Sequence, residues 1–270
     1  MILHQNSCMR TFRPIQGEHD GCNEKTGAGM SGRLLGQRVI VLGASSGIGL
    51  AVAREALREG AEVLVVSSQI SRIEKALEHL GSKAQGCALD LLDERAIERF
   101  FATNGAFDHL VYTAGDALQI GALSGTDLTA ARSAFDVRYW GALAAAKHGA
   151  RHIRPGGSIT FTTGIAAMRP QSGWVLGASV CGAMEALTRA LAVELAPLRV
   201  NAVSPGVTAT NLWADMTPVQ RKQMFDDVGD ALLVGRVGSA EDIAAAYLFL
   251  MSSGFATGQT HIVDGGALLI

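Results

Sequence analysis

Short apolar runs alternate with longer segments of helical periodicity from residue 37 to the end of the chain. Such alternation favours parallel strands joined by crossover helices. Seven short apolar runs are the predicted strands, over residues 39–42, 62–66, 84–88, 110–112, 158–162, 200–203 and 261–263. The pattern therefore predicts an α/β fold, a single doubly wound Rossmann domain with a seven-stranded parallel sheet.

Six helices are predicted between these runs, over residues 48–59, 71–80, 93–103, 128–154, 175–196 and 240–251. Pro155 and Pro197 follow two of the predicted helix ends, where proline acts as a stop signal. The segment 211–237 mixes polar and apolar positions and interrupts the alternation. It is either a lid or substrate loop, or an ordinary surface excursion.

The first 32 residues differ in kind from the rest, because they are rich in glycine and polar residues and contain no apolar block of signal-peptide type. We expect a disordered N-terminal extension over 1–32 and one dinucleotide-binding domain over 33–270. Glu18, Asp20 and Glu24 argue against an organelle transit peptide.

Composition and charge narrow the classes of ligand. The chain of 270 residues is 48% hydrophobic and 18% charged, with a formal net charge of -2, so neither nucleic acid nor an anionic membrane surface is an expected partner. The later apolar runs are broken by charges before the ~18 residues that a membrane span requires. We therefore expect a protein without a membrane segment that acts on a small molecule.

Cysteine and histidine positions give no metal site. Cys8, Cys22, Cys87 and Cys181 show no ligand spacing, which is typical of a reduced cytoplasmic protein. His148 and His152 lie four residues apart and could hold a metal, but no third ligand is evident nearby, so the preferred interpretation is two solvent-facing residues.

A glycine-rich turn follows the first predicted strand. It reads Gly43-Ala44-Ser45-Ser46-Gly47-Ile48-Gly49 and leads into a predicted helix. Glycines let the backbone approach a pyrophosphate closely, and the helix start directs unpaired N–H groups at it. The spacing differs from the general dinucleotide fingerprint, so a simple tight turn is the alternative.

Five stretches in order resemble the short-chain dehydrogenase/reductase family over almost the whole chain after residue 33. They are the turn 43–49, Thr113-Ala114-Gly115 in place of the family's Asn-Ala-Gly, the stretch 199–206, the stretch 235–238 and the stretch 257–266. The resemblance implies a Rossmann domain that binds NAD(P)(H) and transfers hydride. It also implies a homodimer or homotetramer, and small residues along 175–196 suit a subunit interface or close packing within one monomer.

The resemblance further implies which residues contact the coenzyme. They are Gly43, Ser45, Ser46, Gly47, Ile48, Gly49, Ser67, Ser68, Asp90, Leu91, Ala114, Gly115, Pro205, Gly206, Val207 and Thr210. For Asp90 alone, an acid near a helix N-cap is the alternative. The second strand ends in Ser67-Ser68-Gln69, which has neither an acid for the ribose 2′-OH nor an arginine for a 2′-phosphate. Without an acid nothing repels the 2′-phosphate, and the two serine hydroxyls could hydrogen-bond to it, so NADP(H) is favoured slightly over NAD(H). The alternative is that these residues merely begin a loop.

The catalytic positions depart from the family's pattern. In the family a Tyr protonates the substrate oxygen, a Lys four residues later lowers the Tyr pKa, a Ser orients the substrate and an Asn organises a proton path. Counting back from 185–191 places the Tyr at Gly177, the Lys at Cys181, the Ser at Gly164 and the Asn at Arg138. The sequence contains no Tyr-x-x-x-Lys, so the family mechanism does not carry over.

Several side chains are candidate substitutes. Arg138 could extend into the space left by the absent Lys and place a positive charge near the nicotinamide ribose, but it cannot act as a general acid. Thr163 could polarise a carbonyl, and Tyr139 or Tyr112 could reach the site, although structural roles are commoner for both residue types. Cys181 is a candidate thiol, with a buried inert cysteine as the preferred alternative.

Two functions remain open at this stage. The first is an NAD(P)(H)-dependent oxidoreductase on a small carbonyl or alcohol, with a non-standard catalytic centre or a substrate that needs no proton donor, such as an activated double bond. The second is a catalytically silent coenzyme-binding protein that senses redox state or serves as a partner subunit. The fold favours the first and the missing residues favour the second.

Overall fold

The structure, a computed structural model, describes residues 32–270, so the predicted extension over 1–32 lies outside it except for Gly32. Seven parallel strands form one sheet in the order β3-β2-β1-β4-β5-β6-β7, as the alternation predicted. The strands are β1 Arg38–Leu42, β2 Glu62–Ser67, β3 Ala84–Ala88, β4 Phe107–Tyr112, β5 Ile153–Thr162, β6 Arg199–Pro205 and β7 Thr260–Val263.

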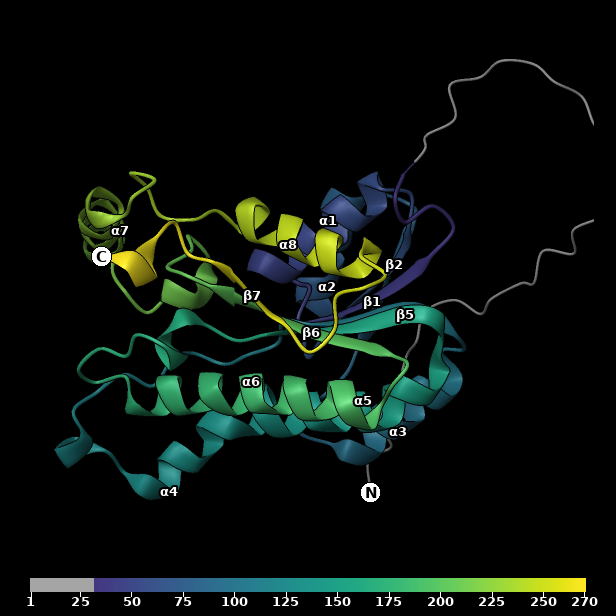
Figure 1. The fold of residues 1–270 in the computed structure, drawn as a ribbon, viewed down its shortest axis with the longest axis horizontal. Helices are drawn as coiled ribbons and strands as arrows, with labels where there is room; N and C mark the ends of the chain where they lie inside the picture. The colour runs from purple at the N-terminus through teal and green to yellow at the C-terminus, as the bar shows by residue number, and fades with distance from the viewer. Residues whose placement is uncertain (1–31) are drawn as a thin grey trace, which may run out of the picture.

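Helices cover both faces of the sheet. The α-helices are α1 Gly47–Arg58, α2 Ile70–Leu80, α3 Glu94–Thr103, α4 Leu128–Ala131, α5 Ala142–Gly149, α6 Val175–Glu194, α7 Pro218–Ala231 and α8 Ala240–Ser252. In Figure 1, α1, α2 and α8 lie on one face, and α3, α5 and α6 lie on the other. Because all seven strands are parallel, their carboxyl ends lie at the same edge of the sheet.

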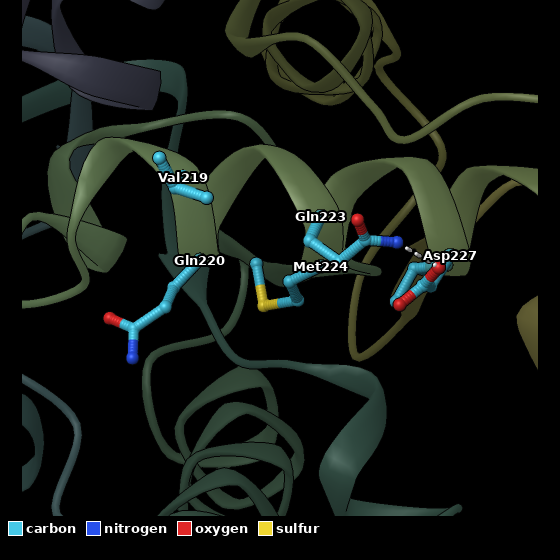
Figure 2. Close-up of a pocket in the computed structure, with 6 residues that line it drawn as sticks. Val219, Gln220, Gln223, Met224 and Asp227 are labelled. Atoms are coloured by element: carbon cyan, nitrogen blue, oxygen red, sulfur yellow. Dashed lines mark hydrogen bonds between the residues drawn. The ribbon is translucent and has the colours of Figure 1, made fainter.

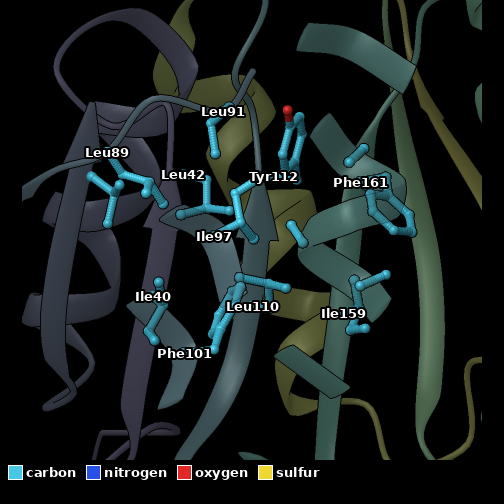
Figure 3. Packing of buried hydrophobic residues seen from close by; sticks show 14 of the residues in the cluster. Ile40, Leu42, Leu89, Leu91, Ile97, Phe101, Leu110, Tyr112, Ile159 and Phe161 are labelled. Carbon is cyan, nitrogen blue, oxygen red and sulfur yellow. The ribbon is translucent and has the colours of Figure 1, made fainter. Parts of the chain in front are cut away.

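Each face of the sheet has its own apolar core. Ile40 and Leu42 belong to the cluster under α3, α5 and α6, where Tyr112 and Phe161 also lie (Figure 3). Val39 and Val41 belong to the cluster under α1 and α8. Both faces of β1 are therefore buried, which explains why it is continuously apolar and not alternating.

The single helix predicted over 128–154 is wrong. The chain passes from α4 through a 3-10 turn, Arg132–Phe135, and a π-helical turn, Asp136–Gly141, before α5 begins. Arg154 and Pro155 belong to β5, so Pro155 does not mark a helix end. Helical periodicity alone does not distinguish α, 3-10 and π turns, since all three place side chains at similar spacings.

The segment 211–237 is more regular than a loop. It contains a 3-10 turn, Asn211–Trp213, and the 14-residue helix α7. Thr217 and Gln220 form a capping box at the start of α7, with Pro218 in its first turn. These start signals can be recognised in the sequence, but the helix itself was not predicted because its apolar periodicity is weak.

One helix among the described residues, α6, is long and apolar enough to cross a membrane, with 20 residues and a mean hydropathy of 1.3 in its most apolar window. We expected charged residues to interrupt every run of this length, and this expectation is wrong for α6. Glu185 and Arg189 are the charged residues within its most apolar window, and two charges do not lower the mean hydropathy of this window below that of a membrane span. One such helix is weak evidence for a span, since core helices meet the same criteria.

Candidate functional site

The glycine-rich turn packs directly against the turn after β4. A Cβ added to Gly43, whose φ is 92°, would lie 2.4 Å from the backbone nitrogen of Ala114. A Cβ added to Gly49 would lie 2.4 Å from the Gly43 carbonyl oxygen and equally close to Thr113 Oγ1. Only glycine fits at these two positions, so the close approach that the sequence predicts is present.

The start of α1 suits an anion. Its N-cap residue, Ser46, has an extended backbone and makes no side-chain cap hydrogen bond. The first amides of the helix therefore receive no cap from the Ser46 side chain, and the helix dipole is positive at this end. Ser45 and Ser67 lie beside them with their hydroxyl oxygens 3.0 Å apart. These groups fit the pyrophosphate of a dinucleotide coenzyme.

Other predicted coenzyme residues gather at the same edge of the sheet. Thr210 lies over the turn, since a Cβ on Gly47 would be 3.4 Å from the Thr210 Cβ. Asp90 is exposed and accepts a hydrogen bond from the Leu92 amide at 2.9 Å, whereas Leu91 is buried in the core. Gly206 follows β6, where its amide donates to the Val263 carbonyl at 2.9 Å.

A cavity of about 310 Å³ adjoins this edge. Thr113 lines it and also contacts the glycine-rich turn, so the cavity and the coenzyme site are continuous. The remaining lining residues come from the loop after β4, from the 3-10 and π turns, from the end of β5 and from α6: Ala114, Asp116, Ala117, Leu118, Gln119, Ser133, Ala134, Arg138, Thr162, Thr163, Leu176, Gly177, Val180, Cys181 and Met184.

The four positions that the resemblance assigns to the family's catalytic residues lie close together at this cavity. Arg138, Gly177 and Cys181 line it, and a Cβ on Gly164 would lie 3.2 Å from the Cys181 Sγ. Four positions that the resemblance selected from distant parts of the chain therefore lie near one another. The structure brings Thr163 there as well, from the end of β5.

Arg138 projects from the π-helical turn and crosses to the turn after β4. Its Nη2 donates to the backbone carbonyl of Asp116, and a Cβ on Gly115 would lie 2.6 Å from its Nη1. Burial lowers the pKa of this guanidinium from its ordinary value, an effect that Cys181, Asp116 and Tyr112 oppose. The side chain nonetheless remains a cation, because arginine does not deprotonate in proteins.

Cys181 lies in the interior of α6 and is partly buried. Burial raises the pKa of its thiol, and the positive charge of Arg138 offsets this effect only in part. The thiolate form is therefore scarce at neutral pH. Thr163 donates from its hydroxyl to the Cys181 carbonyl at 2.9 Å, so this hydrogen is already used.

The two tyrosines considered as substitutes do not line the cavity. The Tyr112 hydroxyl donates to the Val137 carbonyl, and burial raises the pKa of the phenol far above its usual range. The ring of Tyr139 packs against Phe135 and Trp140, at centroid distances of 6.4 and 5.0 Å.

Several lining residues escaped the sequence analysis. Val180 and Met184 follow Gly177 by three and seven residues, so helical spacing from Gly177 would have found them. Trp174 covers Gly177, since a Cβ there would lie 3.3 Å from the indole Cε3. Trp174 in turn packs on Trp213, with centroids 6.4 Å apart.

The histidine pair does not face solvent as expected. His148 is buried, and its Nε2 lies 3.0 Å from Glu94 Oε1, beside the Lys147 ammonium at 2.7 Å. These partners hold the pKa of the Glu94 carboxyl near 2. His152 instead pairs with Arg151 at 3.3 Å. Within residues 32–270, no cluster of three or more metal-ligating side chains occurs.

A second, larger hollow of about 530 Å³ lies along α7. All its lining residues belong to this one helix, and Figure 2 shows Gln220 and Met224 projecting from the same side of it. The smaller cavity is the better candidate site, because several elements enclose it and it adjoins the glycine-rich turn.

Comparison with known proteins agrees with this geometry. The family model described as enoyl-(acyl carrier protein) reductase matches residues 43–267. The short-chain dehydrogenase/reductase ATR9 of Stachybotrys chlorohalonatus is 38% identical over 249 residues, which cover 87% of this chain and 98% of the relative.

Two solved structures show the same fold. A small-chain dehydrogenase crystallised with NADPH is 41% identical, with a TM-score of 0.77 and coverage of 87% of this chain and 100% of that chain. The MalC reductase/Diels-Alderase of Malbranchea aurantiaca is 30% identical, with a TM-score of 0.83 and coverage of 89% and 100%. The chain therefore belongs to the short-chain dehydrogenase/reductase family of NAD(P)-dependent oxidoreductases.

Proposed function

We propose that the protein is an NADP(H)-dependent oxidoreductase with a catalytic centre of its own. The observation that carries this proposal is the continuity of the two sites through Thr113, which contacts the glycine-rich turn and also lines the cavity. A coenzyme bound at the turn and a small acceptor in the cavity would be neighbours. Hydride transfer requires such proximity.

The preference for NADP(H) rests on the end of β2. Ser67 and Ser68 follow the buried part of this strand, and no carboxylate stands there to bind a ribose 2′-OH or to repel a 2′-phosphate. The Ser45 hydroxyl lies 3.0 Å from that of Ser67. The relative crystallised with NADPH supports the same preference.

In this proposal Arg138, Gly164, Gly177 and Cys181 stand in place of the family's Asn, Ser, Tyr and Lys, and the sequence spacing and the proximity of the four positions support the assignment. The bound coenzyme supplies or accepts the hydride. Arg138 holds a permanent positive charge at the cavity, although it stands at the position of the family's Asn and not of its Lys, and it can orient an oxygen without donating a proton to it. The acceptor is a small carbonyl, alcohol or activated double bond.

A silent coenzyme-binding protein is the second candidate function. The hydroxyls of Thr162 and Thr163 favour this function, because both already donate to backbone carbonyls, with oxygen–oxygen distances of 2.8 and 2.9 Å, and so have no proton for a substrate. A protein of this kind would bind NADP(H) and sense its redox state, or act as a partner subunit, with no turnover.

Calorimetric titration with NADPH and with NADH tests the coenzyme site first. We expect micromolar NADPH binding, about -8 kcal/mol. The variant Ser67→Asp adds a carboxylate that repels the 2′-phosphate, so NADPH affinity should fall by more than about tenfold while NADH affinity holds. No binding of either nucleotide would refute both candidate functions. Binding without turnover across a broad acceptor screen would favour the silent protein.

We also propose that the protein forms a homo-oligomer through α6. Val175, Ser179, Ala186, Ala190 and Val193 are exposed along one side of this helix in the single chain. Small residues on such a side allow another copy to approach closely. The cytoplasmic location stays a prediction.

A further inference from the structure

The cavity is formed where side chains are small. Gly177 contributes no side chain, Gly164 leaves the Cys181 Sγ uncovered, and Cys181 itself is short. Leu176, Val180 and Met184 of α6 supply apolar lining. A volume of about 310 Å³ is within the range of small-molecule sites. The small residues at the positions of the family's Ser, Tyr and Lys therefore also leave space for a ligand.

Hydroxyl groups around the cavity have no hydrogen to give to a ligand. Thr162, Thr163 and Thr113 donate to the carbonyls of Tyr112, Cys181 and Leu42, at 2.8, 2.9 and 3.1 Å. Ser133 donates to the Ala130 carbonyl at 2.7 Å. Each lining hydroxyl can accept a hydrogen bond, but donating one would break a bond to the backbone.

Arg138 has the most unused donors of the lining side chains, whereas the Gln119 amide keeps one N–H beside its hydrogen bond to Ser133 at 3.1 Å. A guanidinium has five N–H donors, and this one makes a single hydrogen bond, to the Asp116 carbonyl, within residues 32–270. The same residues form no ion pair with it. A partly buried cation with unused donors at a cavity wall is suited to an anionic oxygen.

We propose that this cavity is the acceptor subsite for an α,β-unsaturated carbonyl compound, and that Arg138 is the catalytic residue that holds the developing enolate oxygen. This inference rests on the proposed hydride transfer from NADPH. It adds the substrate class and the role of one residue.

The electron count of the step agrees with this assignment. The β-carbon of the acceptor gains a hydride from the reduced nicotinamide, and a new C–H bond forms there. The alkene π pair moves between the α-carbon and the carbonyl carbon, and the carbonyl π pair becomes a lone pair on oxygen. The acceptor is reduced by two electrons and the coenzyme is oxidised. Water then protonates the α-carbon.

A saturated ketone suits this site poorly. Hydride transfer to its carbonyl carbon produces an alkoxide, a strong base that requires a proton as it forms. Burial raises the pKa of both the Cys181 thiol and the Tyr112 phenol, so neither donates readily. An enolate spreads its charge and needs only electrostatic stabilisation, which a fixed guanidinium provides.

The direct test uses 4-nitrophenol, a planar phenol whose anion mimics an enolate and absorbs visible light. The dye is titrated into the protein at several pH values, with and without NADPH. We expect the pKa of the bound dye to fall by about 1 to 3 units, so that the anion binds at least about tenfold more tightly than the neutral phenol. Arg138→Met and Arg138→Gln should abolish this preference. Arg132→Met, at an exposed arginine outside the cavity lining, should retain it.

Kinetics with 2-cyclohexenone and cyclohexanone complete the test. We expect NADPH-dependent reduction of the enone alone, with kcat reduced by about 10²- to 10³-fold in the two Arg138 variants. A wild-type protein that binds no NADPH would refute the proposed function. A wild-type protein that binds NADPH would overturn this inference alone if the dye anion is not preferred, if that preference survives Arg138→Gln, or if cyclohexanone is reduced as fast as cyclohexenone.

Discussion

At the residue scale, the glycines of the two sites act in opposite ways. Gly43 and Gly49 bring backbones together so closely that a methyl group would overlap fixed atoms at 2.4 Å. At Gly164 and Gly177 an added Cβ would press only on the side chain of Cys181 at 3.2 Å or of Trp174 at 3.3 Å, and these neighbours need to give by only a few tenths of an ångström. The first pair holds the coenzyme turn together, whereas the second pair leaves room for a ligand.

Gly49→Ala should therefore impair both stability and coenzyme binding. The added methyl group must displace the Gly43 carbonyl or Thr113, and overpacking of this kind costs about 1–3 kcal/mol. Urea unfolding measures the loss, and calorimetry with NADPH measures the accompanying drop in affinity. Gly254→Ala is the matched control, since no atom lies within 4 Å of its added Cβ. Equal stability of the two variants would contradict the close packing described here.

Restoring the family's residues should create a new activity. The variant Arg138→Asn, Gly164→Ser, Gly177→Tyr and Cys181→Lys regains a proton donor, so reduction of a generic diketone should rise by about 10²-fold or more. The Trp174 indole, 3.3 Å from the Cβ of residue 177, must turn aside. No gain in a folded variant that still binds NADPH would mean that the pocket itself has diverged.

The resemblance could select positions that lie near one another because its motifs record chain positions that the fold brings together. Gly164, Gly177 and Cys181 lie far from Gly43 in the chain, yet strand order places them at one edge. The path of the Arg138 side chain across the backbone of Gly115 could not be predicted, because it depends on the π-helical turn that carries it. Local turn type is decided by tertiary packing more than by propensity.

At the element scale, strands were easier to predict than helices. The inner strands β1, β2, β4 and β6 are mostly buried between two layers of helices, so each appears in the sequence as a short apolar run, whereas the edge strands β3 and β7 are only partly buried. The helix α7 escaped notice since only Gly229 is buried along it. An exposed helix has no apolar stripe to read, and its capping box is then the one remaining signal.

The exposed side of α6 leads to a prediction about assembly. Only 22% of the most apolar window of this helix is buried in the single chain, which leaves an uncovered face of small and apolar residues. Ala186→Glu places a charge on that face with little change in helix propensity. Light scattering after size exclusion should give an oligomer for the wild type and a smaller species for the variant. Val219→Glu on exposed α7 is the control and should leave the mass unchanged.

At the scale of the whole molecule, the two ends of the sheet have different roles. The carboxyl ends of the strands carry the glycine-rich turn and the cavity, whereas the amino ends carry buried polar contacts that join neighbouring strands. His109 in β4 belongs to the second group and is 2% exposed. Its Nδ1 lies 2.9 Å from Ser158 Oγ and its Nε2 lies 2.8 Å from Gln37 Oε1. A carboxamide oxygen only accepts, so Nε2–H donates to Gln37 and Nδ1 accepts from Ser158.

This arrangement makes global stability depend on pH. Burial, helped by the charge of Arg199, lowers the pKa of His109 to about 4, below the ordinary value of 6.5. Between these values the unfolded chain binds a proton that the folded chain excludes, so the free energy of unfolding decreases as pH falls from 6.5 to 4. The full contribution is on the order of 3 kcal/mol. His109→Asn should be less stable at neutral pH and should show a shallower loss across this window. Urea unfolding at several pH values measures the slope, with His79→Asn, at an exposed histidine, as the control. A slope equal to that of the wild type in His109→Asn would exclude His109 as its source.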